Sequence, residues 1–144
     1  MNIKKRQISI LLPIREKGVQ LEIHLQRRSA DAKVLPNYFG FWGGGAENSE
    51  TAEEALKREI KEEMGIELDM KKVSLFNHYE FLRSTKDVFL FRPDEGWEDS
   101  IVIGEGDYGK WFKLEEALEN KEIIFEDKVV LNDLDRIILN GPIR

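Results

Sequence analysis

A dense group of charged side chains, most of them acidic, follows a run of three glycines in the first half of the chain. This group consists of one arginine and four glutamates, namely Glu50, Arg58, Glu59, Glu62 and Glu63. On a helix, in which each residue turns by ~100°, Glu62 would lie about 60° to one side of Glu59 and Glu63 about 40° to the other. Three carboxylates on one stripe repel one another unless a cation relieves them. Their oxygens are the ligands that magnesium and manganese prefer, and a metal held in this way can act on a phosphate ester.

Two plainer interpretations of the acidic stripe compete with a metal site. Arg58 lies one turn before Glu62. An ion pair between them would contribute only about 0.2–0.5 kcal/mol and could not neutralise three carboxylates. The stripe could also be a solvated face, which is the usual fate of glutamate-rich helices. Composition alone favours the solvated face, whereas the spacing of the surrounding residues favours the metal site.

The residues around the stripe indicate where a helix begins and ends. Thr51 followed by Glu54 is a capping box, and Gly65 is a C-terminal stop signal. The apolar side of this helix would be formed by Ala52, Ala55, Leu56 and Ile60. We therefore expect a helix between Thr51 and Gly65, with the acidic stripe beside its buried side.

The order of these residues resembles the Nudix box, with every defining position filled: Gly44-x5-Glu50-x7-Arg58-Glu59-Ile60-x-Glu62-Glu63-x-Gly65-Ile66. The resemblance extends loosely to most of the chain. It implies a single Nudix domain over residues 1–144, with an α/β/α sandwich around a mixed central β-sheet. It also implies an enzyme that hydrolyses a nucleoside diphosphate linked to another group, by attack of water on phosphorus. The implied cofactor is Mg²⁺, with Mn²⁺ as the alternative.

The resemblance further implies which residues hold the metal. Glu62 and Glu63 would be the principal ligands, and Glu59 would be a ligand or would position the attacking water. A backbone carbonyl of Gly43 or Gly44 would also reach the metal.

Other residues of the box and one late glutamate receive supporting roles from the same resemblance. Arg58 would orient Glu59 and hold the glycine loop, and Glu50 would be an outer metal ligand or an orienting group. Many relatives carry another glutamate on a late loop, where it binds metal or serves as a base. Glu105 matches that position best, and Glu98 competes with it.

Several residues outside the strict box are candidates for binding substrate. The backbone at Gly44 and Gly45 can approach phosphates closely. Tyr38 and Phe41 could stack on a base, with the neighbouring Phe39 and Trp42 as alternatives, although such aromatic residues are more often simply core. Arg27, with Arg28 and Lys33 nearby, could bind phosphate, but an ordinary charged loop is the plainer interpretation.

The remaining chain alternates short strand patterns with two helical segments. From Val19 to Arg27 apolar and polar residues alternate, which is typical of a half-buried strand and puts His24 on the polar face. We expect the strands at residues 7–15, 19–27, 38–42, 73–76, 78–82, 88–91, 100–103 and 108–112. The segments 115–119 and 126–139 are predicted helices, the second with Val129, Val130, Leu134, Ile137 and Ile138 facing inward.

Composition excludes several classes of protein. The chain has 144 residues, of which 41% are hydrophobic and 35% charged, which fits one globular domain. It has no cysteine and no apolar run near the length of a membrane span, so we expect a cytoplasmic protein without membrane association. A net charge of −6 disfavours binding to a nucleic acid polymer. A homodimer stays open as an alternative to a monomer.

The choice of substrate depends on residues outside the box. The proline after the box that some ADP-ribose hydrolases carry is absent, and so is the upstream motif of coenzyme A relatives. These absences favour a MutT-like nucleoside triphosphate pyrophosphohydrolase, acting on canonical, oxidised or other non-canonical nucleotides. The alternatives are a nucleotide-sugar or ADP-ribose pyrophosphatase and, in another class, a non-catalytic nucleotide sensor.

Overall fold

The apolar run from Ile8 to Ile14 forms the central strand of the fold. In the computed structural model, which describes residues 4–139, this strand is β1 (Arg6–Lys17). Its first half pairs with β4 (Trp42–Gly45) and with β6 (Ser84–Phe91), and its second half pairs with β2 (Gln20–Arg27). A strand covered on both faces reads as a continuous apolar run, which explains why β1 does not alternate.

The other strands extend the sheet on both sides of β1. Its order is β3-β2-β1-β6-β5, with β3 at Phe39–Gly40 and β5 at Val73–Glu80, while β7 (Tyr108–Lys113) also pairs with β2. The pairing of β1 with β6 is parallel, and the other pairings of named strands in the described residues are antiparallel. The expected mixed sheet is therefore confirmed.

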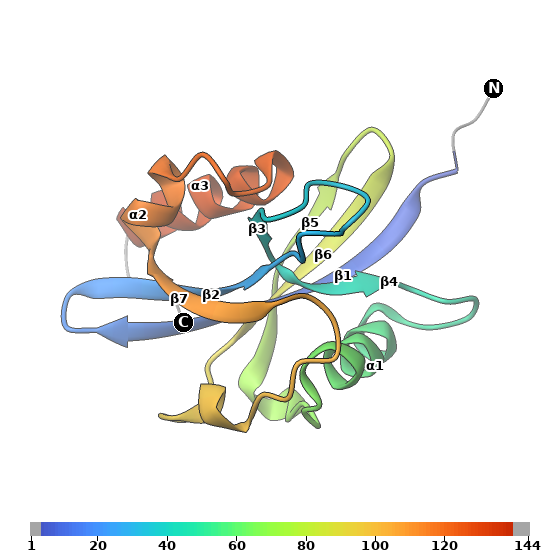
Figure 1. Ribbon diagram of the computed structural model, residues 1–144, viewed down its shortest axis with the longest axis horizontal. Coiled ribbons are helices and arrows are strands. Elements are labelled where there is room, and N and C mark those ends of the chain that lie inside the picture. Colours follow the sequence, from blue (N-terminus) through green and yellow to red (C-terminus); the bar gives the residue numbers. More distant parts are fainter. Residues whose placement is uncertain (1–3, 140–144) are drawn as a thin grey trace.

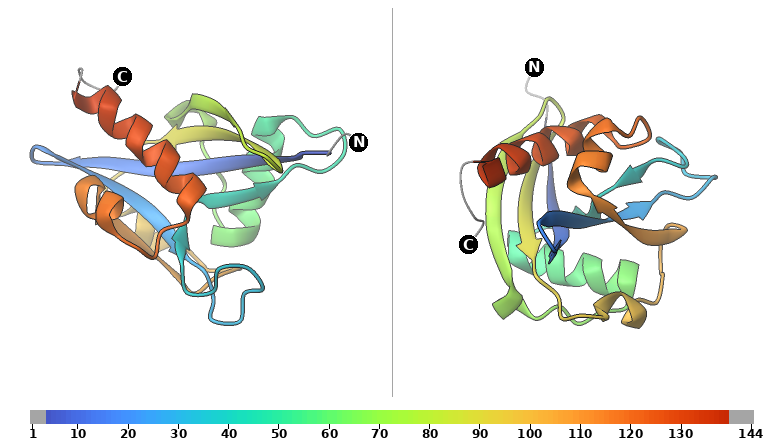
Figure 2. Two further views of the ribbon diagram at one scale, coloured as in Figure 1. Left: turned by 90° about the horizontal axis from the view of Figure 1, so that it is seen from above. Right: turned by 90° about the vertical axis from the view of Figure 1, so that its left-hand side faces the viewer.

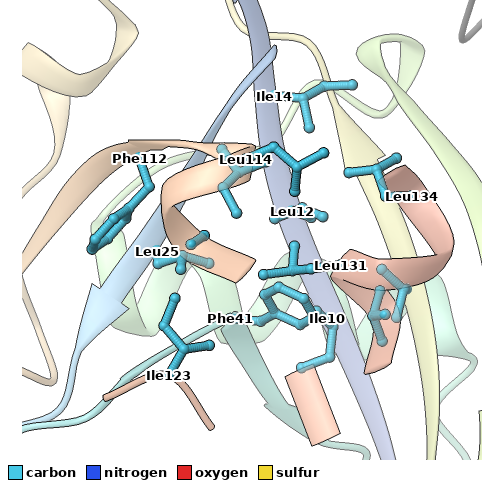
Figure 3. Close-up of a cluster of buried hydrophobic side chains, with 14 of the residues drawn as sticks. Ile10, Leu12, Ile14, Leu25, Phe41, Phe112, Leu114, Ile123, Leu131 and Leu134 are labelled. Atoms are coloured by element: carbon cyan, nitrogen blue, oxygen red, sulfur yellow. The ribbon is translucent and has the colours of Figure 1, made fainter. Parts of the chain in front are cut away.

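Helices cover both faces of the sheet, as Figures 1 and 2 show. Helix α1 (Ala52–Met64) packs on one face through Leu56, Ile60 and Met64. The helices α2 (Leu114–Glu119) and α3 (Phe125–Leu139) pack on the other face, where Leu131 and Leu134 meet β1 residues such as Leu12 (Figure 3). Two short 3-10 helices, η1 (Met70–Lys72) and η2 (Trp97–Ser100), lie in connections. These layers confirm the α/β/α sandwich.

The local signals at the ends of α1 act as predicted. The Thr51 hydroxyl accepts a hydrogen bond from the Glu54 N–H, and the Glu54 carboxylate accepts one from the Thr51 N–H. Gly65 ends the helix in the left-handed conformation, with φ of 69°. The acidic residues of α1 are therefore held at the phase that the sequence predicts.

The strand predicted at residues 38–42 is wrong in its bounds. The chain changes partner at Phe41, since β3 pairs with β2 whereas β4 pairs with β1. The Phe41 N–H donates to the side chain of Asp127, not to a neighbouring strand. The three glycines then belong to β4, and β4 brings them against β1.

The strand predicted at residues 100–103 is also wrong. Residue 100 ends η2, and the following segment crosses the C-terminal end of α1. There the N–H groups of Val102 and Gly104 donate to the carbonyls of Met64 and Glu63, each at 2.8 Å. Carbonyls at a helix C-terminus have no partner within the helix, so they recruit this segment away from a β-ladder. We call residues 101–107 the strap.

Smaller differences concern the β5–β6 hairpin and the exposure of single residues. The strands predicted at 73–76 and 78–82 form one strand, β5, with an irregularity between Leu75 and Asn77, and β6 begins at Ser84 instead of Val88. Val19 lies in the turn before β2 and is fully exposed, so it does not begin the strand as predicted. Ile137 is 45% exposed, so it does not face inward as predicted. His24 is buried because β7 brings Trp111 over its face of the sheet.

Candidate active site

The acidic stripe of α1 lines a cleft of about 560 Å³ beside the glycines of β4. One side of this cleft is acidic and is formed by Glu59, Glu62, Glu63 and Glu105. The other side is lined by apolar residues and ends in a charged pair; these residues are Ile8, Ile10, Phe41, Ile124, Lys86 and Asp127. The cleft therefore joins a carboxylate cluster to a partly apolar compartment.

Glu63 is the most deeply buried member of the carboxylate cluster. Only 5% of the residue is exposed, and its Oε1 accepts a 2.7 Å hydrogen bond from the Gly43 N–H. Burial raises the pKa of Glu63 to about 8, and the nearby charges of Glu59, Glu105 and Glu62 act in the same direction. Because its negative charge is unfavourable at this buried position, Glu63 is the carboxylate that a bound cation would stabilise most.

Glu59 lies directly against the backbone of the glycine run. A Cβ atom on Gly44 would overlap the Glu59 carboxylate, so the absence of a side chain at Gly44 allows this carboxylate to take its position. Burial raises the pKa of Glu59, against the opposing effect of a 2.9 Å hydrogen bond from Arg58. Glu59 and Glu63 thus share a desolvated site that favours a metal ion or a proton.

Arg58 ties the glycine strand to α1. Its Nε and Nη2 donate to the two carboxylate oxygens of Glu50 at 2.8 and 2.9 Å, and Nη2 also donates to the Gly45 carbonyl at 2.9 Å. The hydrogen bonds that Glu50 accepts from Arg58 and from the Glu47 N–H lower the pKa of Glu50 to about 2. Glu50 also accepts from the Glu47 N–H and does not line the cleft, so its position fits an orienting group better than a metal ligand.

The strap brings Glu105 to the cleft. The Glu105 carbonyl accepts a 2.8 Å hydrogen bond from the Gln26 side chain, and the Asp107 N–H donates to the Arg27 carbonyl. With the Gly104 bond to α1, both sides of Glu105 are fixed. Glu98 instead lies 3.4 Å from Arg15 and does not line the cleft. Of the two late glutamates, the structure brings Glu105 to the site.

The predicted substrate-binding residues divide into two groups. Phe41 and Gly44 line the cleft. Arg27 and Tyr38 do not line it. The Arg27 guanidinium instead donates to the Tyr108 hydroxyl and lies near the Phe39 ring. Gly45 has its carbonyl engaged by Arg58, while Gly43 lines the cleft beside Glu63.

The alternatives named for these positions are also separated. Arg28 lines the cleft in place of Arg27. Phe39 packs against Phe112, and Trp42 is buried beside His24, to which its indole N–H donates at 3.1 Å. Phe41 is therefore the one member of that aromatic run that reaches the cleft.

Sequence reasoning missed a buried ion pair at the far end of the cleft. Lys86 Nζ lies 3.2 Å from Asp127 Oδ1, and both residues are more than nine-tenths buried. The second oxygen of Asp127 accepts the Phe41 N–H, as noted for the strand change. The signal in the sequence was a lysine inside the apolar strand 84–91, but its partner lies 41 residues away.

The donor set of the cleft fits a hard divalent cation. The four glutamates of the carboxylate cluster face one cavity, and two of them have raised pKa values. Within residues 4–139 no three acidic or histidine side chains converge as a complete metal cage. Magnesium usually keeps several waters and takes substrate phosphate oxygens as ligands, so it does not require such a cage.

Comparison with known proteins identifies the class and then two kinds of relative. The NUDIX domain model matches residues 4–134, so the chain belongs to the Nudix family and is a Nudix hydrolase. It is 36% identical over 113 residues to the 8-oxo-dGTP diphosphatase of Escherichia coli K12, covering 78% of this chain and 83% of that protein. It is 35% identical over 131 residues to the nucleoside triphosphatase NudI of Escherichia coli O139:H28, covering 90% of each.

Solved structures agree on the fold. A MutT/nudix family protein from Enterococcus faecalis matches with a TM-score of 0.75 and 15% identity, over 96% of this chain and 64% of that chain. One from Listeria innocua matches with a TM-score of 0.69 and 20% identity, over 94% of each. None of the helices within residues 4–139 combines the length and hydropathy that a bilayer span requires.

Proposed function

We propose that this Nudix hydrolase is a nucleoside triphosphate pyrophosphohydrolase that uses Mg²⁺ and releases nucleoside monophosphate and pyrophosphate. The observation that carries the proposal is the two-sided cleft, which sets a carboxylate cluster beside an apolar compartment containing Phe41. A base fits the apolar side, and a metal-bound phosphate chain fits the acidic side. The names of the two relatives, an 8-oxo-dGTP diphosphatase and a nucleoside triphosphatase, support this choice.

The carboxylates of the site have different proposed roles, either binding metal or holding other groups in place. Glu59, Glu62 and Glu63 would hold Mg²⁺, with the Gly43 carbonyl as a further oxygen donor. When bound, Mg²⁺ would neutralise phosphate charge and make hydroxide available near neutral pH. Arg58 and Glu50 would keep Glu59 and the glycine strand in place.

Glu105 has a different position and a different proposed role. Its side chain is exposed on the strap at the edge of the cleft, while its backbone is fixed on both sides. A carboxylate in such a place can accept the proton of the attacking water.

The substrate side of the cleft would bind the base of the nucleotide. Phe41 offers an apolar surface, and Lys86 with Asp127 offers a donor and an acceptor at the end of the same compartment. We include oxidised guanine nucleotides among the proposed substrates. Lys86 can donate a hydrogen bond to a base and Asp127 can accept one, so the two residues could bind an oxidised or an unmodified base.

The experiment is a panel of canonical and oxidised nucleoside triphosphates, ADP-ribose, nucleotide sugars and dinucleoside polyphosphates, each with Mg²⁺ in ¹⁸O-labelled water. Both products are identified, and the label is located by mass spectrometry. We expect monophosphate and pyrophosphate from triphosphates, with one product labelled, and no turnover in the presence of a chelator. Turnover confined to ADP-ribose or nucleotide sugars would overturn the substrate assignment. Nucleotide binding without any hydrolysis would indicate a sensor.

A further inference from the structure

Arg6 supplies a positive charge at the edge of the cleft that the Nudix box does not include. It is the first residue of β1, and Arg6, Ile8 and Ile10 line the cleft in the alternating pattern of one strand face. The Arg6 guanidinium lies over Gly45, because a Cβ atom at that glycine would fall 2.7 Å from Nε and 3.0 Å from Nη2. Its position therefore depends on the absence of a side chain at residue 45.

The donors of Arg6 differ from those of the other cations in the cleft. Lys86 is paired with Asp127 and Glu126, and Arg28 donates to the Val34 carbonyl. The side chain of Arg6 has no hydrogen-bond or ion-pair partner among residues 4–139. An arginine fork with free donors beside a cleft is suited to bidentate binding of a phosphate.

The order of groups along the glycine strand indicates which phosphate would reach Arg6. Along the axis of the glycine strand, Glu63 is bonded at Gly43, Glu59 lies against Gly44 and Arg6 lies over Gly45. Gly44 and Gly45 face opposite sides of the strand, but Glu63, Glu59 and Arg6 all line the same cleft. A nucleotide with its base at Phe41 and its reacting phosphate at the carboxylates would extend its remaining phosphates toward Arg6.

We propose that Arg6 binds the terminal phosphate of the nucleoside triphosphate and so favours triphosphates over diphosphates. This inference rests on the proposed function, and it adds a residue that determines the length of the phosphate chain. Within residues 4–139 the Arg6 side chain makes no hydrogen bond or ion pair with the carboxylates of the cleft, so its contribution is to binding more than to bond cleavage. Its loss should raise KM more than it lowers kcat.

Gly45 provides an independent way to move the guanidinium. The φ angle of Gly45 lies outside the left-handed region, so alanine is compatible with its backbone. The atoms that a new Cβ would meet are the end of a flexible side chain. Gly45→Ala should therefore displace the Arg6 fork while the strand stays intact.

The test measures KM and kcat for dGTP and dGDP, and calorimetric binding of pyrophosphate with Mg²⁺. It compares Arg6→Gln, Arg6→Lys, Gly45→Ala and, as a matched control, Arg83→Gln at the exposed neighbour whose carbonyl pairs with the Arg6 N–H. For Arg6→Gln we expect about a 10-fold higher KM for dGTP and about 10-fold weaker pyrophosphate binding. The KM for dGDP should change less than about 2-fold.

The variants should fall in a defined order. Arg6→Lys and Gly45→Ala should give intermediate losses for dGTP, and Arg83→Gln should match the wild-type protein. Equal losses for dGTP and dGDP, or equal losses in Arg6→Gln and Arg83→Gln, would overturn the role of Arg6. If neither nucleotide is hydrolysed by the wild-type protein, the proposed function fails. In that case the binding of pyrophosphate tests the role of Arg6 independently. Equal binding by the wild-type protein and Arg6→Gln, or no binding by the wild-type protein, would overturn that role.

Discussion

The Gly43 N–H donates a 2.7 Å hydrogen bond to Oε1 of Glu63, twenty residues further along the chain. This bond joins the glycine strand to the acidic helix at the point where Glu63 is buried. A carboxylate with a pKa raised to about 8 is costly to ionise in the absence of a cation. The ionised form of Glu63 therefore destabilises the metal-free protein, and a bound metal ion would remove that cost.

Replacing Glu63 by glutamine should abolish turnover and leave the fold intact. The amide oxygen of glutamine can still accept the Gly43 N–H, while the charge that holds the metal is lost. We expect kcat to fall more than about 100-fold, since even outer-shell partners of a metal contribute about 10- to 100-fold. Glu53→Gln, at an exposed position of the same helix, is the control. Retention of half the wild-type rate by Glu63→Gln would exclude the ligand assignment.

Stabilisation by Mg²⁺ should grow with pH. The folded-state pKa of Glu63 is raised from 4.5 to about 8, so between these values the folded protein holds a proton that the unfolded chain lacks. The metal-free contribution of Glu63 to stability is full below pH 4.5 and is lost as pH rises through 8. Mg²⁺ needs the ionised carboxylate. Melting temperatures with and without Mg²⁺ should therefore differ more at pH 8 than at pH 6, and equal differences would contradict metal binding by Glu63.

His24 should make the protein less stable in mild acid. Burial among aromatic rings is the main reason why its pKa falls to about 4. Between pH 6.5 and 4 the unfolded chain binds a proton that the folded protein does not, so this contribution to stability is full above pH 6.5 and is lost toward pH 4. In urea unfolding at pH 7 and pH 5, His24→Asn should lose less stability on acidification than the wild-type protein.

The second histidine provides a control of opposite sign. Hydrogen bonds to Asp87 and Glu80 raise the pKa of His78, so its contribution is full in acid and is lost as pH rises through the folded-state value. His78→Asn should lose more stability on acidification than the wild-type protein. If both variants show the wild-type dependence, neither histidine controls the acid response.

Arg58→Lys should disorganise the site although the positive charge remains. A lysine ammonium cannot serve Glu50, Glu59 and the Gly45 carbonyl together as the guanidinium does. We expect kcat to fall about 10- to 100-fold with a lower melting temperature. Lys57→Gln, at the exposed preceding residue, should leave both unchanged. An Arg58→Lys variant with wild-type kcat would show that the bidentate bond to Glu50 is dispensable.

Gly104→Ala should displace the strap and with it Glu105. A Cβ atom there would overlap the Glu62 carbonyl, which belongs to the backbone of α1 and cannot move aside easily. We expect a destabilisation of about 1–3 kcal/mol, as for other overpacked sites, together with a loss of kcat. Ile103→Ala changes the neighbouring side chain without adding an atom near α1 and should retain activity. Wild-type kcat in Gly104→Ala would indicate that Glu105 has no part in the reaction.

Local interactions made α1 predictable from the sequence. Its capping box, its C-terminal glycine and the phase of Glu59, Glu62 and Glu63 depend on residues within one or two turns, and the resemblance to the Nudix box rests on the same short stretch. The alternation that predicts β2 is equally local. By itself, therefore, the sequence determined the family, the acidic helix and most of the strands.

Only the tertiary structure decided which other residues join the acidic helix. The sequence favours Glu105 but leaves Glu98 as a competitor, and the strap separates them by using backbone groups to cap α1. Phe41 faces the cleft because the chain changes sheet partner there. Contacts such as Arg6 over Gly45 and Lys86 with Asp127 join residues about 40 positions apart, and no short-range pattern encodes them. They arise when the sheet and helices pack, because packing brings together side chains that local propensity leaves independent.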